Sequence, residues 1–301
     1  MKAVLLNGYG SVDQLAYEEI PIPLAGAGEV LVKMASTSVN PIDYKIRRGD
    51  MKEIMPLQLP FIPGYDLAGQ VVALGEGATS VKLDALVMGV TDYTYAEYVV
   101  CKAGILAPIP AGLELNEAGA YPLVLQTGAQ LIERGVTSRS GVRLLITGAL
   151  GSVGRVAVHV ARKHGAYVIA GVRSSQRAEA EKLGVSEVVA VDDESQLNSL
   201  KELDAVADTV GREVIDRLIP HIRKNGVLAT VVGKPESADG RDLQVNEVWS
   251  TSDPKRLQEL AGELARGEFT LPISKRLKLA DIRQAHVLAE KGAAGKIVIT
   301  P

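Results

Sequence analysis

The chain has 301 residues with 33 Lys and Arg against 36 Asp and Glu, a formal net charge of −3, and 47% apolar residues, which excludes a chain that is disordered throughout. The near-neutral charge argues against a dedicated nucleic-acid or anionic-membrane surface, and no apolar run approaches the roughly 18 residues of a membrane span. Cys101 is the only cysteine, which excludes an intramolecular disulfide, a CxxC metal site and an iron–sulfur cluster. We therefore expect no nucleic-acid and no membrane partner, and a cytoplasmic location, because a lone cysteine fits a reducing compartment.

Residues 1 to about 110 have the pattern of a β-rich domain. Apolar runs at 4–6, 30–34 and 70–74 are separated by Gly and Pro, and this spacing predicts a sandwich or barrel of short strands. Six prolines between Pro21 and Pro63 disfavour long helices in this part.

From Gly141 onward, short apolar runs alternate with amphipathic stretches. The pattern predicts strands at 142–147, 167–172, 187–191, 205–208 and 227–232, and helices from 153 to about 165, near 175–183 and near 212–222. Helices at 254–266 and 280–291 and a closing strand at 297–299 follow. Strands that alternate with helices indicate βαβ units in a parallel sheet.

A glycine-rich turn joins the strand at 142–147 to the helix after it. Its glycines are Gly148, Gly151 and Gly154, and Leu150, Ser152 and Val153 stand between them. Glycines allow the backbone to approach a pyrophosphate, and a helix N-terminus offers free N–H groups and a partial positive charge. The context predicts a dinucleotide site; the alternative is a turn that binds nothing.

The end of the next strand indicates which dinucleotide is bound. NAD sites carry an acidic residue about 20 residues beyond the glycines, where it binds the ribose 2′-hydroxyl. Arg173 occupies this place, and Ser174, Ser175 and Arg177 follow it. Arginines and hydroxyls suit a 2′-phosphate, so the sequence favours NADPH. The alternative is that both arginines are solvated surface charges.

Several separated motifs, taken together, resemble one family. They are residues 39–49, 63–69 and 95–98, the glycine turn, Asp208-Thr209-Val210-Gly211, and residues 295–298. In order and spacing they resemble the zinc-free quinone oxidoreductase branch of the medium-chain dehydrogenase/reductase superfamily. The resemblance implies an α/β protein with a GroES-like β-barrel catalytic domain of residues 1–122 and 267–301. Residues 123–266 would form a Rossmann domain, a doubly wound parallel sheet that binds NADPH, and the resemblance also implies a homodimer.

The zinc ligands of the metal-dependent relatives are missing from the matching motifs. Gly64-Tyr65-Asp66 stands where those enzymes have Gly-His-Glu, and the four histidines show no metal-ligand spacing. We therefore expect no metal. Without a metal Lewis acid, hydride transfer to an electron-poor acceptor is favoured. The expected substrate is therefore an electrophilic carbonyl compound, either a quinone or an α,β-unsaturated carbonyl.

The resemblance also assigns individual residues. Asn40 and Thr127 are expected at the nicotinamide ribose and ring, and Tyr44 is expected to present its phenol to the substrate; a tyrosine packed at the barrel surface is the alternative. Asn40 and Tyr44 are therefore the expected catalytic residues. The remaining cofactor residues that the resemblance implies are Thr209, Val232, Gly233 and Lys296. Asp43 and Asp66 either orient Tyr44 or Lys45 or cap turns.

Three rival functions stay open at this point. The first is reduction of saturated ketones or aldehydes, and the second is a crystallin-like NADPH-binding protein without turnover. The third is a methyltransferase, against which Arg173 argues, because such sites normally place a carboxylate on the ribose. The segments 50–60 and 234–246 are expected to be loops that wall the substrate pocket.

Overall fold

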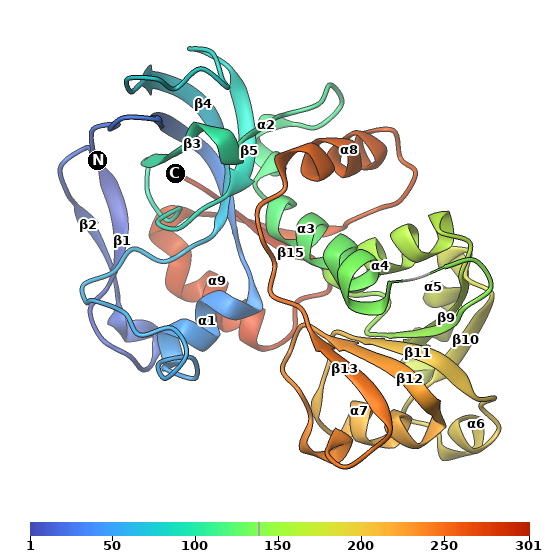
Figure 1. Ribbon diagram of the computed structural model, residues 1–301. Coiled ribbons are helices and arrows are strands. Elements are labelled where there is room, and N and C mark those ends of the chain that lie inside the picture. Colours follow the sequence, from blue (N-terminus) through green and yellow to red (C-terminus); the bar gives the residue numbers. More distant parts are fainter. Residues whose placement is uncertain (138) are drawn as a thin grey trace. The chain divides into compact units, whose positions relative to one another are not determined.

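The computed structural model describes residues 1–137 and 139–301, which form two compact units (Figure 1). One unit comprises Met1–Leu123 and Ser252–Pro301, and the other comprises Val124–Thr251. The chain passes from the first unit to the second after Leu123, within one residue of the expected boundary after residue 122. The return comes at Ser252 rather than at 267, because helix α8 (Pro254–Ala265) belongs to the first unit and packs against strand β7 (Ala107–Pro108).

The first unit is built on a mixed sheet. Its strand order is β14-β15-β3-β4-β5-β7, with β6 also paired to β3. The bounds are β3 Glu29–Val39, β4 Asp66–Leu74, β5 Leu86–Val90, β6 Tyr98–Lys102, β14 Ile273–Lys278 and β15 Lys296–Thr300, with a separate pair of β1 Lys2–Leu6 and β2 Leu15–Glu19. The helices of this unit are α1 Pro41–Arg48, α2 Leu115–Ala118, α8 and α9 Ile282–Glu290.

Pairing between the end of the chain and β3 positions one half of the candidate site. Strand β15 runs antiparallel to β3, with Ile297 opposite Val39. Lys296 and Asn40, the next residues outward, therefore lie beside each other although 256 residues separate them. The alternating apolar residues of these strands are buried in the core of this unit, so the register that places Lys296 is fixed by burial.

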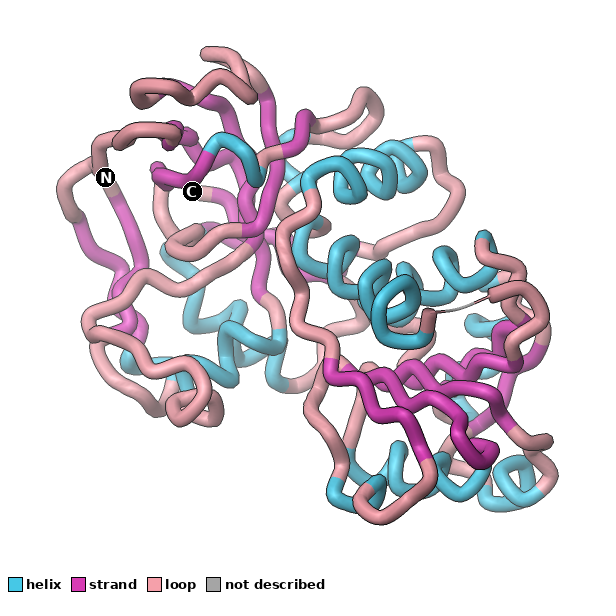
Figure 2. Tube along the Cα trace, in the orientation of Figure 1, coloured by secondary structure: helices cyan, strands magenta, loops and turns pink. Residues whose placement is uncertain are grey.

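The second unit is a six-stranded parallel sheet in the described residues, in the order β10-β9-β8-β11-β12-β13. The strands are β8 Arg143–Thr147, β9 Tyr167–Val172, β10 Glu187–Ala190, β11 Leu203–Asp208, β12 Ile222–Thr230 and β13 Leu243–Glu247. The helices are α3 Pro122–Gln130, continued by a π-helix at Leu131–Val136, α4 Ser152–Lys163, α5 Arg177–Ala180, α6 Glu194–Asn198 and α7 Arg212–Leu218. Helices α4 and α7 lie on opposite sides of the sheet (Figure 1), and Figure 2 shows the alternation of strands and helices. The predicted α/β class and doubly wound sheet are confirmed.

The second unit differs from the expectation in two places. The segment expected as a loop at 234–246 contains the edge strand β13, parallel to β12, in which Leu243 and Val245 alternate with polar residues and pack on the core. The helix expected at 175–183 is divided into two 3₁₀ turns, at Ser174–Gln176 and Glu181–Leu183, with the short α5 between them. In the described part of the chain, no helix is long and apolar enough to cross a bilayer.

Candidate functional site

The glycine turn of the second unit is closely packed against its surroundings. Gly148 has φ +59°, and a Cβ there would lie 2.7 Å from the Thr209 hydroxyl. A Cβ on Gly154 would lie 2.1 Å from the carbonyl oxygen of Gly148, so only glycine fits. Gly151 is the N-cap of α4 and is exposed. The turn thus leaves the first N–H groups of a 12-residue helix at the carboxyl end of β8, as a pyrophosphate site requires.

A buried carboxylate organises the strand ends around this turn. One oxygen of Asp208 accepts hydrogen bonds from the Thr147 hydroxyl at 2.8 Å and from the backbone N–H groups of Val210 and Gly211 at 3.1 and 2.9 Å. Its other oxygen accepts one from the Thr230 hydroxyl at 3.2 Å. Asp208 therefore joins the ends of β8, β11 and β12. This role of Asp208 is not predicted from the sequence, although its position at the end of a predicted buried strand is the signal that marks it.

The structure gathers most of the predicted cofactor residues in the second unit. Gly148, Leu150, Gly151, Ser152, Val153, Arg173, Ser174, Ser175, Arg177, Thr209, Val232 and Gly233 all follow the carboxyl ends of β8, β9, β11 or β12. Thr209 donates its hydroxyl to the carbonyl oxygen of Thr147 at 2.7 Å. Thr127 is on α3, next to Gly128, where a Cβ would lie 2.6 Å from Val156 of α4. Ligands of open parallel sheets bind at this edge. No contact to a cofactor tests these assignments, so they stay predictions.

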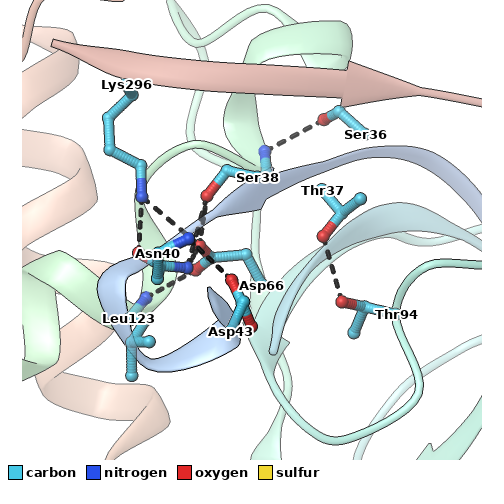
Figure 3. A network of polar contacts seen from close by, with 10 residues as sticks. Ser36, Thr37, Ser38, Asn40, Asp43, Asp66, Thr94, Leu123 and Lys296 are labelled. Atoms are coloured by element: carbon cyan, nitrogen blue, oxygen red, sulfur yellow. Dashed lines mark hydrogen bonds and ion pairs between the residues drawn. The ribbon is translucent and has the colours of Figure 1, made fainter. Parts of the chain in front are cut away.

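Asn40 and Lys296 belong to a buried polar network in the first unit (Figure 3). The Lys296 ammonium donates to the amide oxygen of Asn40 at 2.6 Å and lies 3.6 Å from a carboxylate oxygen of Asp66. The Asn40 amide nitrogen donates to the same Asp66 oxygen at 2.7 Å, and the Ser38 hydroxyl also donates to it. The side chain of Lys296 is 4% exposed and that of Asp66 0%. These contacts fix which way the Asn40 amide faces.

Asp43 secures the start of helix α1, directly after Asn40. Its carboxylate accepts the backbone N–H of Asn40 at 2.6 Å, and Pro41 stands at the first helical position. The pKa of Asp43 is raised to about 7, above all by burial; the charge of Asp66 also raises it, whereas the hydrogen bond from the Asn40 N–H and the charge of Lys296 lower it. Burial lowers the pKa of Lys296, and the two carboxylates oppose that shift. Asp43 thus acts as a cap, one of the two roles expected for it.

Tyr44 lies on α1 and is half-buried. The Arg48 guanidinium lies 5.3 Å from the centre of its ring, in cation–π contact. In the network itself, the second oxygen of Asp66 accepts the backbone N–H of Leu123 at 2.7 Å. Tyr44 as a substrate-facing phenol stays a prediction.

Comparisons with known proteins agree with this architecture. Residues 26–111 match the alcohol dehydrogenase GroES-like domain, and residues 183–299 match the family described as zinc-binding dehydrogenase. The chain is 28% identical to the chloroplast envelope quinone oxidoreductase homolog of Arabidopsis thaliana over 100% of this chain and 98% of that protein. It is 29% identical to 2-methylene-furan-3-one reductase of Solanum lycopersicum over 100% and 79%. The structure of the quinone oxidoreductase from Coxiella burnetii is similar with a TM-score of 0.90 and 25% identity, over 100% of this chain and 99% of that one.

The fold, the two matched domains and the full-length relatives define an oxidoreductase architecture. The chain belongs to the medium-chain dehydrogenase/reductase superfamily, in its quinone oxidoreductase branch. This superfamily uses NAD(P)H.

Gly151 offers a direct test of the glycine turn. A Cβ there meets only the carbonyl oxygen of Gly148, at 3.1 Å, so Gly151→Asp is expected to fold with a small local shift. Its carboxylate would lie where the pyrophosphate is expected. NADPH affinity measured by titration should fall at least about tenfold, or about 1.4 kcal/mol.

Gly104→Asp is the matched control, because a Cβ there has open space and the residue lies in the other unit. It adds the same charge and should bind NADPH normally. If folded Gly151→Asp binds NADPH as tightly as this control, the turn does not hold the cofactor.

Proposed function

We propose that the protein is an NADPH-dependent, zinc-independent oxidoreductase that transfers hydride to a quinone or an α,β-unsaturated carbonyl compound. The observation that carries the proposal is the set of contacts made by Asp66. This residue stands where zinc-dependent relatives have the glutamate of Gly-His-Glu. Both of its oxygens accept hydrogen bonds from within the first unit, and Lys296 lies beside it. The contacts that Asp66 makes support a positioning role for this carboxylate, and with it a zinc-independent reaction.

Cys101 supports the same proposal. It lies in β6 opposite Val30 and is 5% exposed, and burial raises the pKa of its thiol to about 12. Zinc is bound by the thiolate, which this environment disfavours. The thiol therefore has the properties of a small core residue.

The residues divide the expected work between them. A bound nicotinamide cofactor supplies the hydride. The N-terminus of α4 and the glycine turn would hold its pyrophosphate, and Arg173 and Arg177 its 2′-phosphate. Asn40, with its amide direction fixed by Lys296 and Asp66, would orient the nicotinamide ribose. The Tyr44 hydroxyl would donate a hydrogen bond to the acceptor oxygen, and the proton would come from that hydroxyl or from solvent.

To test the proposal, purified protein is mixed with NADPH and each acceptor of a panel, and the rate of NADPH oxidation is measured from the loss of its absorbance. Quinones and enones should be reduced and the matching saturated ketones and aldehydes should be nearly inert, with rates that a zinc chelator leaves unchanged. Comparable kcat/KM values for saturated carbonyls would favour the rival ketone reductase. NADPH binding without reduction of any acceptor would favour a crystallin-like binding protein. A homodimer and a cytoplasmic location stay predictions.

A further inference from the structure

The ends of strands β9 and β10 lie side by side in the second unit. The two strands are parallel, with Val172 opposite Ala190. Ser174 is two residues beyond the first of these and Asp192 is two residues beyond the second, so the sheet register brings them together. The backbone N–H of Val191 donates to the carbonyl oxygen of Val172 at 2.9 Å and extends this alignment past the strands.

Asp192 accepts hydrogen bonds from both donors of Ser174. The backbone N–H and the hydroxyl of Ser174 both donate to the same oxygen of Asp192, each at 2.8 Å. These bonds lower the pKa of Asp192, which keeps the carboxylate ionised at neutral pH. Ser174 is one of the residues expected to bind a 2′-phosphate, so a negative charge already occupies its donors.

The positive charge of Arg177, near Ser174 in the chain, is also partly neutralised. One guanidinium nitrogen of Arg177 lies 3.4 Å from a Glu181 carboxylate oxygen, and another donates to the side-chain oxygen of Gln196 at 3.0 Å. Arg173 is exposed at the start of the same turn. The place expected to bind the 2′-phosphate, after the end of β9, thus combines two guanidinium groups with the carboxylates of Glu181 and Asp192.

We propose that Asp192 is a specificity-determining residue, which weakens the preference for NADPH so that the site also accepts NADH. The inference rests on the proposed cofactor function. A 2′-phosphate must displace Asp192 from the Ser174 donors or bind beside its negative charge, and both cost affinity. A ribose 2′-hydroxyl carries no charge and can donate a hydrogen bond to the carboxylate. The acidic residue of NAD sites accepts such a bond from the end of the neighbouring strand, the place that Arg173 occupies here.

Asp192→Asn tests the inference because it removes the charge and keeps the shape. Dissociation constants for NADPH and for NADH are measured by nucleotide fluorescence titration at low salt. The ratio of the NADH constant to the NADPH constant should rise about fivefold or more, since one unit charge about 4 Å away in water contributes roughly that factor. Glu194→Gln is the matched control: it removes the same charge from an exposed residue two positions along the chain, and the ratio should not change.

The outcomes separate this inference from the proposed function. Wild-type protein that binds both nucleotides, together with a ratio that Asp192→Asn leaves unchanged or lowers, overturns the role of Asp192 alone. An equal rise of the ratio in Glu194→Gln also overturns it, because the effect would then be general charge. Failure of the wild type to bind either nucleotide overturns the cofactor proposal, and the inference with it.

Discussion

Replacing Lys296 with Met is expected to lower the free energy of unfolding by about 3–5 kcal/mol, because it leaves buried carboxylates without their positive partner. Lys296 is the donor to Asn40 at 2.6 Å and lies 3.6 Å from Asp66, which is 0% exposed. Met has a similar length and keeps the apolar stem. Denaturant unfolding of the variant and the wild type measures the difference.

Two further variants identify the cause. The double variant Lys296→Met, Asp66→Asn removes both charges and should recover much of the lost stability, because a neutral pair costs less to bury. Lys275→Met changes an exposed lysine of β14 and should have little effect. A double variant less stable than Lys296→Met alone would show that the loss comes from packing rather than from charge.

The pH dependence of the free energy of unfolding tests the role of the Lys296 charge independently. Lys296 lowers the pKa of Asp43, so removing it should raise that pKa above its value of about 7. A carboxyl with a raised pKa in the folded state binds more protons there than in the unfolded chain, so stability increases as pH falls through the folded pKa toward about 4. The deficit of Lys296→Met relative to the wild type should therefore shrink between pH 8 and pH 5. A deficit that is constant over this range would contradict the assignment.

Local patterns predicted most of the fold. The short apolar runs of the second unit and the glycine turn sufficed for β8, α4, β9, β11 and β12, because a buried parallel strand followed by an amphipathic helix has a strong periodic signature. Strand β13 was missed because only Leu243 and Val245 mark it within a polar segment. Helix α8 was assigned to the wrong unit, since an amphipathic pattern shows that a face is buried and not against which partner.

The candidate site was predictable residue by residue but not in its connections. Motifs identified Asn40 and Lys296 separately, whereas their direct contact follows from the antiparallel pairing of β15 with β3. The anchoring roles of Asp66 and Asp208 depend on which donors the strands bring within reach. Asp192 follows β10 in the sequence, and only the register with β9 places it against Ser174. Contacts of this kind are set by tertiary pairing, which a single sequence does not encode locally.

The double variant Arg173→Ala, Arg177→Ala is expected to raise the NADPH dissociation constant about ten- to a hundredfold, with little change for NADH. One charge-assisted hydrogen bond to a phosphate contributes about 1.5–3 kcal/mol, and NADH lacks the phosphate. The double variant is preferred to Arg173→Ala because both arginines follow the end of β9 and either can compensate for the other. Titration at two salt concentrations should show a smaller difference at high salt, since both side chains are exposed and their charges are screened.

Arg223→Ala provides the control for this last comparison. Arg223 also carries an exposed guanidinium in the second unit, but it lies near the start of β12, at the amino edge of the sheet, where it pairs with Asp204 at 2.7 Å. Its loss changes the net charge of the unit without touching the carboxyl edge, so both nucleotides should bind as in the wild type. If the double variant loses NADPH and NADH equally, or if the wild type binds NADH more tightly than NADPH, then the two arginines do not bind a 2′-phosphate.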